Sequence, residues 1–427
     1  MDIIAKTDSF LKYHRMSVDD VVIEEVCESM LSEMESGLRG EESSLEMIPT
    51  YVDVPERVAP LDPVVVIDAG GTNFRAALAQ FSESGEFQVQ SVIKTKMPGT
   101  RHYLGKDEFF LAMAEIVRDL VEKSDKIGFC FSYPTEIYPN RDGRLIRFVK
   151  EIKAPEVEGE LIGENLLATL GVKKKIVVLN DTVATLLAGK AASVKRSYSS
   201  YIGFILGTGC NGCYIESCHN IGKLCENMGH QIINAELGNF NKLDQGLIDL
   251  ALDEGTDNPG INSFEKMISG GYLGNLVLRT LQKAADEKII DKETGKGLKK
   301  ISKIDTSDLN DFLISPKGGN ILAGVCGEKG TDSREIFYYI AMNLVKRAAK
   351  LAAAALSALC VKSGAGTSGS SPVCITAEGS TFYMLKNLRE YTLHYLKHYL
   401  AGQKGIYSEI ISVDDATFKG AAIAGLF

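Results

Sequence analysis

The sequence predicts a two-lobed α/β protein, and three observations lead to this fold class. Apolar strands and amphipathic helices alternate along most of the chain, which is typical of α/β proteins. The 427 residues are more than one ordinary hydrophobic core contains, so two domains or lobes are expected. A strand–glycine turn–strand unit also occurs twice, at 64–80 and at 201–216, which suggests two related lobes that face each other.

The elements follow each other in an order that supports this class. The first 60 residues are acidic and predict helices. Strands with a hairpin signal at 82–86 are expected between Val64 and about Ile93. Beyond them we expect an amphipathic helix at 108–123, strands at 127–134 and 174–181 with a helix around 163–170 between them, and a helix at 183–192.

The second half of the chain is predicted to be mostly helical. Helices are expected over 264–288 and 333–363. The stretch GAGTSGSSP at 364–372 predicts a flexible loop, and a strand that enters a turn and a helix is expected over 372–385. These elements complete an alternating α/β order.

The composition is that of an ordinary globular protein, with 45% apolar and 24% charged residues. A net charge of −9 argues against a general affinity for nucleic acid or anionic membrane. A polyanionic ligand must then be held by backbone amides, a few basic groups or a metal ion. The absence of a long apolar run and of a secretory pattern predicts a cytoplasmic location. The oligomeric state is left open between monomer and homodimer.

The stretch VVVIDAGGTNFR at 64–75 drives an apolar strand into a glycine turn. Because glycine has no Cβ, a phosphate oxygen can approach the main chain there. Asp68 lies too early in the turn to donate to phosphate, and we expect it to hold magnesium through water. The alternative is a plain hairpin in which Asp68 caps the turn. The candidate phosphate ligands are Gly70, Gly71, Thr72, Asn73 and Arg75.

Two further turns repeat this design. LGTGCN at 206–211 offers Gly207, Thr208 and Gly209, and TAEGST at 376–381 is a third small, hydroxyl-rich turn after a strand. The chain contains neither GxxxxGK[ST] nor a GxGxxG that opens a helix, so P-loop and Rossmann sites are not expected. Two glycine hairpins from facing lobes and a third loop are predicted to hold the phosphates of a nucleotide between them.

Asp181 is the candidate general base. It ends the apolar stretch KKIVVLND at 174–181, directly before a helix, and carboxylates at strand ends commonly point into the ligand crevice of α/β proteins. In a phosphotransferase such a carboxylate takes the proton of a substrate hydroxyl as it attacks the γ-phosphate. The alternative is that Asp181 only caps the helix. Candidate clamps for sugar hydroxyls are Ser132, Lys150, Asn180, Asn211, Glu236 and Glu265.

These stretches resemble the eukaryotic-type hexokinase family. DAGGTNFR, FCFSYP, VVLNDTVAT, LGTGCNGCYIE, INAELGNF, FEKMISGGYLG and KGAAIAG occur in the family's order, and SLEMIPTYV resembles its leader, from about residue 44 to the C-terminus. The resemblance implies an actin-like ATPase (ribonuclease H-like) fold in a single catalytic unit. It also implies an N-terminal helical segment (1–62) on the large lobe, a small lobe (63–181, with a helix at about 416–427) and a large lobe (182–415).

The resemblance also implies an ATP-dependent hexose 6-phosphotransferase. MgATP and a hexose, most simply glucose, are then the substrates, and the lobes close when sugar binds. Asp181 resembles the family's base, and the six clamp candidates resemble its sugar contacts. The first glycine turn with Asp68 and the second with Gly207 resemble its two phosphate motifs. Gly379 and Ser380 resemble its nucleotide loop.

Three positions depart from the family pattern. Val149 stands where the family usually has threonine before Lys150, and Asn262 stands in for a glutamine before the FEK glutamate. Both changes leave sugar affinity and selectivity open. Glu378 replaces the aspartate of the nucleotide loop, which leaves the adenosine site open. A kinase for mannose, fructose or an amino sugar, a sugar sensor without turnover and a sugar-independent ATPase are therefore kept as alternatives.

The pair Cys210-x-x-Cys213 superficially suggests a zinc or redox site. The pair lies inside the second glycine turn and no second CxxC follows, so free thiols are expected. Thiols beside the sugar site leave sensitivity to oxidation open. His394 and His398, four residues apart on a predicted helix, are expected to lie on a helix surface.

Overall fold

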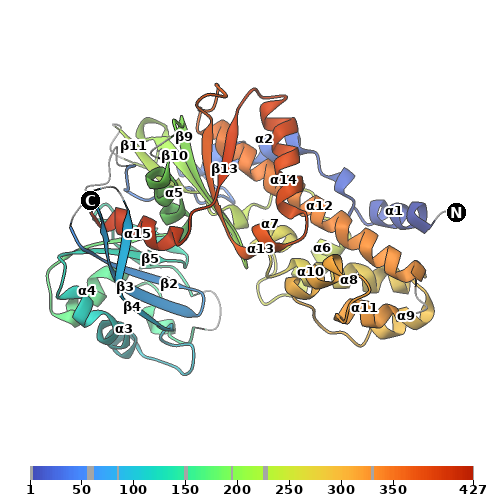
Figure 1. Ribbon diagram of the computed structural model, residues 1–427, viewed down its shortest axis with the longest axis horizontal. Coiled ribbons are helices and arrows are strands. Elements are labelled where there is room, and N and C mark those ends of the chain that lie inside the picture. Colours follow the sequence, from blue (N-terminus) through green and yellow to red (C-terminus); the bar gives the residue numbers. More distant parts are fainter. Residues whose placement is uncertain are drawn as a thin grey trace.

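The computed structural model describes residues 3–54, 62–83, 86–148, 152–193, 196–224, 229–327 and 331–426. Two sheets, each with its own helices, lie side by side and are joined by α5 (Asp181–Ala192) and α15 (Ala416–Leu426), as Figure 1 shows. The predicted Lys150 and the departure at Val149 lie outside the described residues. The residue boundaries of the lobes stay predictions.

The smaller lobe is built on a five-stranded sheet with the order β4-β3-β2-β5-β8. Strands β2, β5 and β8 are parallel, whereas β3 and β4 run antiparallel to their neighbours. Helices α3 and α4 contact each other on one face of this lobe. Its elements are β2 (Val64–Gly70), β3 (Asn73–Phe81), β4 (Phe87–Lys96), α3 (Lys106–Val121), β5 (Lys126–Phe131), β6 (Thr135–Ile137), β7 (Gly143–Leu145), the 3₁₀ turn Pro155–Val157, α4 (Ile162–Leu170) and β8 (Lys175–Leu179).

The apolar run that opens β2 is explained by burial on both faces. Val65 and Ile67 belong to the core beneath α3 and α4, whereas Val64 and Val66 belong to the core shared with α5 and α15. A strand that is buried on both sides needs apolar residues throughout instead of an alternating pattern. On the second face α15 lies so close that a Cβ on Gly128 would sit 1.8 Å from the Ala421 carbonyl oxygen.

The larger lobe is built on a six-stranded sheet with the order β1-β11-β10-β9-β12-β13. Strands β9, β12 and β13 are parallel, and β1, β11 and β10 are antiparallel to their neighbours. The strands are β1 (Ile48–Pro49), β9 (Ser200–Leu206), β10 (Cys210–Ser217), β11 (His230–Asn234), β12 (Val373–Glu378) and β13 (Ser408–Ile411), with 3₁₀ turns at Cys218–Asn220 and Leu237–Asn239.

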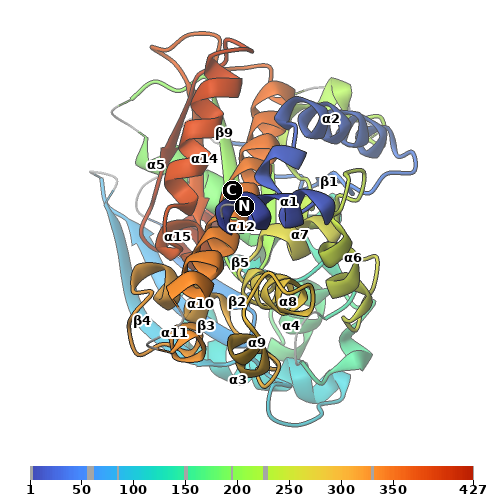
Figure 2. The same ribbon diagram turned by 90° about the vertical axis from the view of Figure 1, so that its right-hand side faces the viewer.

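Helix α12 (Thr331–Lys362) runs through the larger lobe, and Figure 2 shows the N-terminal helices beside it. Both α1 and α2 contact α12, so the acidic N-terminal segment covers this lobe. No helix in the described ranges has the length and hydropathy needed to cross a bilayer. The remaining helices are α1 (Ile3–Tyr13), the 3₁₀ turn Val18–Asp20, α2 (Ile23–Arg39), α6 (Leu247–Glu254), α7 (Ser263–Ile268), α8 (Leu273–Asp286), α9 (Lys292–Leu298), α10 (Thr306–Ile314), α11 (Ile321–Cys326), α13 (Ser380–Met384), α14 (Leu388–Leu396) and the π turn Lys397–Ala401.

The helix predicted over 264–288 is not continuous, and this difference matters for the site. The chain leaves helical geometry after α7 and re-enters it at α8. Between them, the N–H groups of Gly270 and Gly271 donate to the carbonyl oxygens of Gly207 and Thr208 at 2.8 and 3.0 Å. The two glycines therefore bond to the second predicted phosphate turn instead of to their own helix.

Candidate functional site

Three parallel strands of the smaller lobe end at one edge of its sheet. The register pairs Asp68 of β2 with Cys130 of β5, and Cys130 with Leu179 of β8. Ser132 follows β5 and donates its backbone N–H to the Ala69 carbonyl oxygen at 3.0 Å. Asn180 follows β8 directly. Residues that are far apart in the sequence are thus brought together at the carboxyl edge, where α/β sheets bind ligands.

The N-cap of α5 is Asn180, not Asp181. The Asn180 Oδ1 accepts from the backbone N–H of Thr182 at 2.9 Å and from its hydroxyl at 2.7 Å. Asp181 is the first residue of the helix, and its Oδ1 also accepts from the Thr182 N–H at 2.9 Å. Because Asn180 fills the capping position, capping alone does not explain an aspartate at position 181.

The first glycine turn is a two-residue hairpin loop. Gly70 pairs with Asn73 across the strands, and Gly71 has a φ of +60°, a backbone conformation that glycine adopts without strain. The turn is held by the Tyr133 hydroxyl, which donates to the Gly71 carbonyl oxygen at 2.6 Å. The Met97 N–H donates to the Thr72 carbonyl oxygen at 3.0 Å. The backbone carbonyls of this turn thus have partners inside the smaller lobe.

Arg75 is engaged by the carboxylate that precedes this turn. Its Nε and Nη2 both donate to Oδ2 of Asp68, at 2.9 and 2.5 Å. Nη2 also reaches the Thr417 hydroxyl at 3.2 Å, and the guanidinium lies 4.8 Å from the centre of the Phe418 ring. The ion pair therefore connects the first hairpin to the start of α15, which packs against both α5 and the smaller sheet.

The second glycine turn is a three-residue loop between β9 and β10, where Leu206 pairs with Cys210. Besides the bonds from the N–H groups of Gly270 and Gly271, the turn accepts a bond from the Thr381 hydroxyl, which donates to the Gly207 carbonyl oxygen at 2.9 Å. A Cβ on Gly209 would sit 2.6 Å from the Glu265 carboxylate. Thr208 is exposed at the tip of the loop. Three separate segments of the larger lobe thus hold this turn in place.

The third loop lies directly against the second turn. Gly379 has a φ of +114°, and a Cβ there would meet the Leu206 carbonyl oxygen at 2.2 Å. Ser380 begins α13 and is exposed. Only glycine allows both the backbone angle and the close approach at position 379. The second and third predicted nucleotide turns are therefore one contiguous structure.

Amide and carboxylate side chains gather at the start of β10 and the end of β11. Asn211 Nδ2 donates to Asn234 Oδ1 at 2.9 Å and to Glu236 Oε1 at 3.2 Å. Asn234 Nδ2 donates to the same Glu236 oxygen at 2.7 Å. Glu265 Oε2 accepts from the Cys210 N–H at 2.9 Å. This planar, hydrogen-bonding set suits a ligand with many hydroxyl groups.

The charge of Asp181 raises the pKa of two carboxyls of the larger lobe. Burial raises the pKa of Glu236 to about 7, and the negative charges of Glu46, Asp181 and Glu265 add to that rise. Burial also raises the pKa of Glu378 to about 7, with contributions from Asp181 and Asp68. Asp181 therefore contributes to the raised pKa of a carboxyl in the amide–carboxylate cluster and of one that precedes Gly379 in the third loop.

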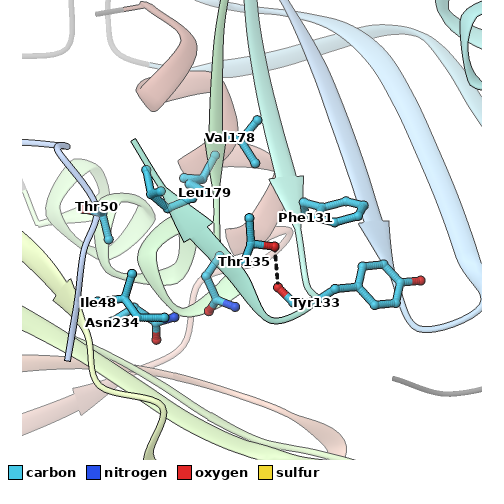
Figure 3. A pocket seen from close by; sticks show the side chains of 10 residues that line it. Ile48, Thr50, Phe131, Tyr133, Thr135, Val178, Leu179 and Asn234 are labelled. Atoms are coloured by element: carbon cyan, nitrogen blue, oxygen red, sulfur yellow. Dashed lines mark hydrogen bonds between the residues drawn. The ribbon is translucent and has the colours of Figure 1, made fainter. Parts of the chain in front are cut away.

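A small enclosed cavity adjoins this cluster between the lobes (Figure 3). Ile48 and Asn234 line it from the larger lobe, and Phe131, Tyr133 and Leu179 line it from the smaller one. Asn180 also belongs to its wall. Asn180, a predicted sugar contact, therefore lines the same cavity as Asn234 of the larger lobe's amide cluster.

Several contacts in this region cannot be predicted from the sequence. Asn234, which bonds to both Asn211 and Glu236, lies in the INAELG stretch, where nothing in its spacing distinguishes it from a solvated asparagine. The bonds of Gly270 and Gly271 to the second glycine turn cannot be predicted either, because both glycines lie inside a sequence pattern typical of a helix. Asn262 precedes α7 with a left-handed φ of 57° and stays a predicted sugar contact.

The cysteine pair in the second turn has the properties of buried structural thiols. Cys213 Sγ donates to the Thr182 carbonyl oxygen at 3.1 Å, and burial raises its pKa to about 12. Burial also raises the pKa of Cys210 well above its usual value, with a further contribution from Glu265. Since the thiolate is the reactive form, slow oxidation of both thiols is expected.

Comparison with known proteins places the chain in one family. Two family models, both described as hexokinase, match residues 8–191 and 201–427. Glucokinase-1 of Kluyveromyces lactis is 30% identical over 95% of this chain and 94% of its own length. Hexokinase-1 of Schizosaccharomyces pombe is 27% identical over 96% of this chain and 88% of its own length.

Solved structures agree with this result. A hexokinase from Schistosoma mansoni complexed with glucose has a TM-score of 0.81 and 26% identity, and the match covers 99% of this chain and 98% of that one. A second hexokinase structure has a TM-score of 0.78. The predicted fold class, the two-lobed actin-like ATPase fold, is confirmed. The chain belongs to the hexokinase family.

Proposed function

We propose that this chain transfers the γ-phosphate of ATP to the 6-hydroxyl of glucose and of other hexoses. The observation that carries the proposal is the convergence of Asp181, two glycine hairpins and an amide–carboxylate cluster on one region between the lobes. The similarity to a hexokinase that binds glucose supports the choice of sugar. Hexose 6-phosphate and ADP are the products.

In the proposed mechanism Asp181 is the general base. Its carboxylate accepts the proton of the 6-hydroxyl while that oxygen forms a bond to the γ-phosphorus. The bond between the γ-phosphorus and the β,γ-bridging oxygen breaks, and ADP leaves with that electron pair. Asn180 already fills the capping position of α5, so the proposed role gives a reason for a carboxylate at position 181 that capping does not.

The remaining predicted residues would bind and orient the two substrates. The amide–carboxylate cluster orients the sugar, because carboxylates accept hydroxyl protons and amides serve as both donors and acceptors. We propose that sugar binding closes the lobes around the substrates, which excludes water from the γ-phosphate. Sugar is assigned to Ser132, Lys150, Asn180, Asn211, Glu236, Asn262 and Glu265, and nucleotide to Gly70, Gly71, Thr72, Asn73, Arg75, Gly207, Thr208, Gly209, Gly379 and Ser380.

Magnesium is assigned to Asp68, and the residues present fit such an ion. Arg75 and Thr417 both approach Oδ2 of Asp68, whereas Oδ1 lies toward Gly70, 3.9 Å from where a Cβ on that glycine would sit. One carboxylate oxygen therefore faces the phosphate turn and can hold a hydrated ion through water. When bound, the ion would offset the negative charge of the phosphates.

The test is ADP release from ATP with glucose, mannose, fructose or glucosamine, with and without magnesium. We expect strong stimulation by hexose, greatest for glucose, and dependence on magnesium. Preference for another sugar would reassign the substrate. Equal ADP release with and without sugar would indicate an ATPase, and sugar binding without ADP release would indicate a sensor; either result would overturn the proposal.

A further inference from the structure

The leader strand β1 pairs with β11, the strand that leads to the proposed sugar clamp Glu236. In the antiparallel pair β1–β11, Ile48 lies opposite Asn234 and Pro49 opposite Ile233. Glu46 precedes β1 by two residues, and Glu236 follows β11 by two residues. The family resemblance assigns no role to Glu46, so its position requires a separate explanation.

Hydrogen bonds tie Glu46 to the turn that carries Glu236. The Asn239 Nδ2 donates to Glu46 Oε1 at 3.3 Å. The N–H of Asn239 in turn donates to the Glu236 carbonyl oxygen at 3.1 Å, which closes the 3₁₀ turn. Glu236 itself has a left-handed φ of 56°. Glu46 therefore bonds to Asn239 at the end of a turn that begins at Glu236, the residue with the unusual backbone conformation.

The charges around Glu236 are mostly negative. The carboxylates of Glu46, Asp181 and Glu265 all act on it, and Glu46 is the strongest of the three. Lys223 is a cation on this side, and its ammonium donates to the Glu46 carbonyl oxygen at 2.7 Å. Asn211 and Asn234 offset the repulsion with amide donors to Glu236.

We propose that Glu46 is a positioning residue of the hexose site, a negative charge just before the leader strand that acts on the sugar through Glu236 and its turn. The inference rests on the proposed function, because it assumes that Glu236 binds sugar hydroxyls. Glu46 does not touch the sugar in this account. It influences the ionisation of Glu236 and holds the orientation of the turn from Glu236 to Asn239.

The consequence is a hexose affinity that depends on pH near neutrality. Ionised Glu236 accepts hydrogen bonds from sugar hydroxyls, whereas the protonated form loses acceptor capacity. The pKa of Glu236 is raised to about 7, so glucose affinity should fall as pH drops through that value. Removing the Glu46 charge lowers this pKa, because a neighbouring like charge disfavours ionisation. The loss of affinity should then move to lower pH.

The experiment is calorimetric titration of glucose into the full chain between pH 5.5 and 8.5, for wild type and Glu46→Gln. We expect the midpoint of the affinity loss to move down by roughly half a unit or more in the variant. Glu42→Gln is the matched control, since Glu42 is exposed on the same segment, and its midpoint should equal that of wild type. Glu46→Asp, which keeps the charge, should restore most of the wild-type profile.

The outcomes separate this inference from the proposed function. If wild type does not bind glucose, or if Glu236→Gln binds it as tightly as wild type, the proposed sugar site fails. If both behave as expected but Glu46→Gln keeps the wild-type midpoint, the role of Glu46 is overturned. Thermal unfolding of each variant shows whether Glu46→Gln is misfolded. If it is, the Glu46→Asp profile decides: a wild-type midpoint of the affinity loss supports the role of Glu46, and a midpoint lowered as expected for Glu46→Gln overturns it.

Discussion

The two glycine hairpins look alike in sequence but are supported in different ways. Besides the bonds from Tyr133 and Met97 to its carbonyls, the hairpin at Gly70–Gly71 has a charged pair beside it, in which Arg75 bonds twice to the nearly buried Asp68. The hairpin at Gly207–Gly209 is held by neutral bonds to backbone carbonyls from the 270–271 segment and Thr381. Both turns thus have neutral bonds to their carbonyls, to which one lobe adds a charged pair and the other adds close contacts at Gly209 and Gly379.

This difference matches the roles proposed for the two hairpins. A charged support beside the first turn can respond to a bound cation and to phosphate, because electrostatic interactions change with each added charge. A support of backbone bonds and close glycine contacts instead gives a fixed surface against which a nucleotide can rest. Substitutions in the two hairpins should consequently fail in different ways.

The largest effect is expected at Gly379, which packs against the larger-lobe hairpin. Gly379→Ala combines an unfavourable positive φ with a contact of 2.2 Å to the Leu206 carbonyl oxygen, and should cost roughly 2–5 kcal/mol. We expect a lower Tm by calorimetry and a raised KM for ATP. The matched control is Gly405→Ala, where φ is +67° but a Cβ meets nothing within 4 Å. Equal losses in the two variants would contradict close packing at Gly379.

An intermediate effect is expected when the charged support of the smaller-lobe hairpin is removed. Arg75→Met leaves Asp68, 8% exposed, without its guanidinium partner, and hydrogen bonds to charged groups contribute about 1.5–3 kcal/mol. We expect kcat/KM for ATP to fall by roughly 10- to 100-fold, with glucose affinity unchanged in calorimetry.

Arg196→Met is the control for this variant, since Arg196 pairs with Glu409 on the surface and exposed pairs contribute little. Steady-state kinetics of both variants decide the matter. An Arg75→Met enzyme as active as the control would show that the ion pair does not support the hairpin.

The smallest effect is expected from one neutral bond of the larger-lobe hairpin. Thr381→Val removes the hydroxyl that donates to Gly207 while keeping the side-chain volume, at a cost of about 1 kcal/mol. KM for ATP should rise only a few-fold. Thr392→Val, which removes a buried hydroxyl bond inside α14, should lower Tm similarly and leave KM unchanged. A rise in KM in both variants would mean that the effect is not local to the hairpin.

The sequence predicted the parts of the site that follow from local patterns. An apolar run into Asp-Ala-Gly-Gly-Thr-Asn indicated the β2–β3 hairpin, and the position of Asn180 and Asp181 between a strand and a helix indicated a site at a sheet edge. It did not reveal Gly270 and Gly271 as a brace, because their apolar neighbours have helical spacing. The bonds that break this helix come from the second hairpin, 60 or so residues away in the chain, and local spacing carries no record of such partners.

The most direct test of the account compares wild type with Asp181→Asn for both glucose binding and glucose-dependent ADP release. Asparagine keeps an oxygen that can accept from the Thr182 N–H but cannot take up a proton from the 6-hydroxyl. We expect glucose affinity within a few-fold of wild type and kcat lowered roughly 10²- to 10⁴-fold. A variant that binds glucose and releases ADP at the wild-type rate would contradict the assignment of Asp181 as the base.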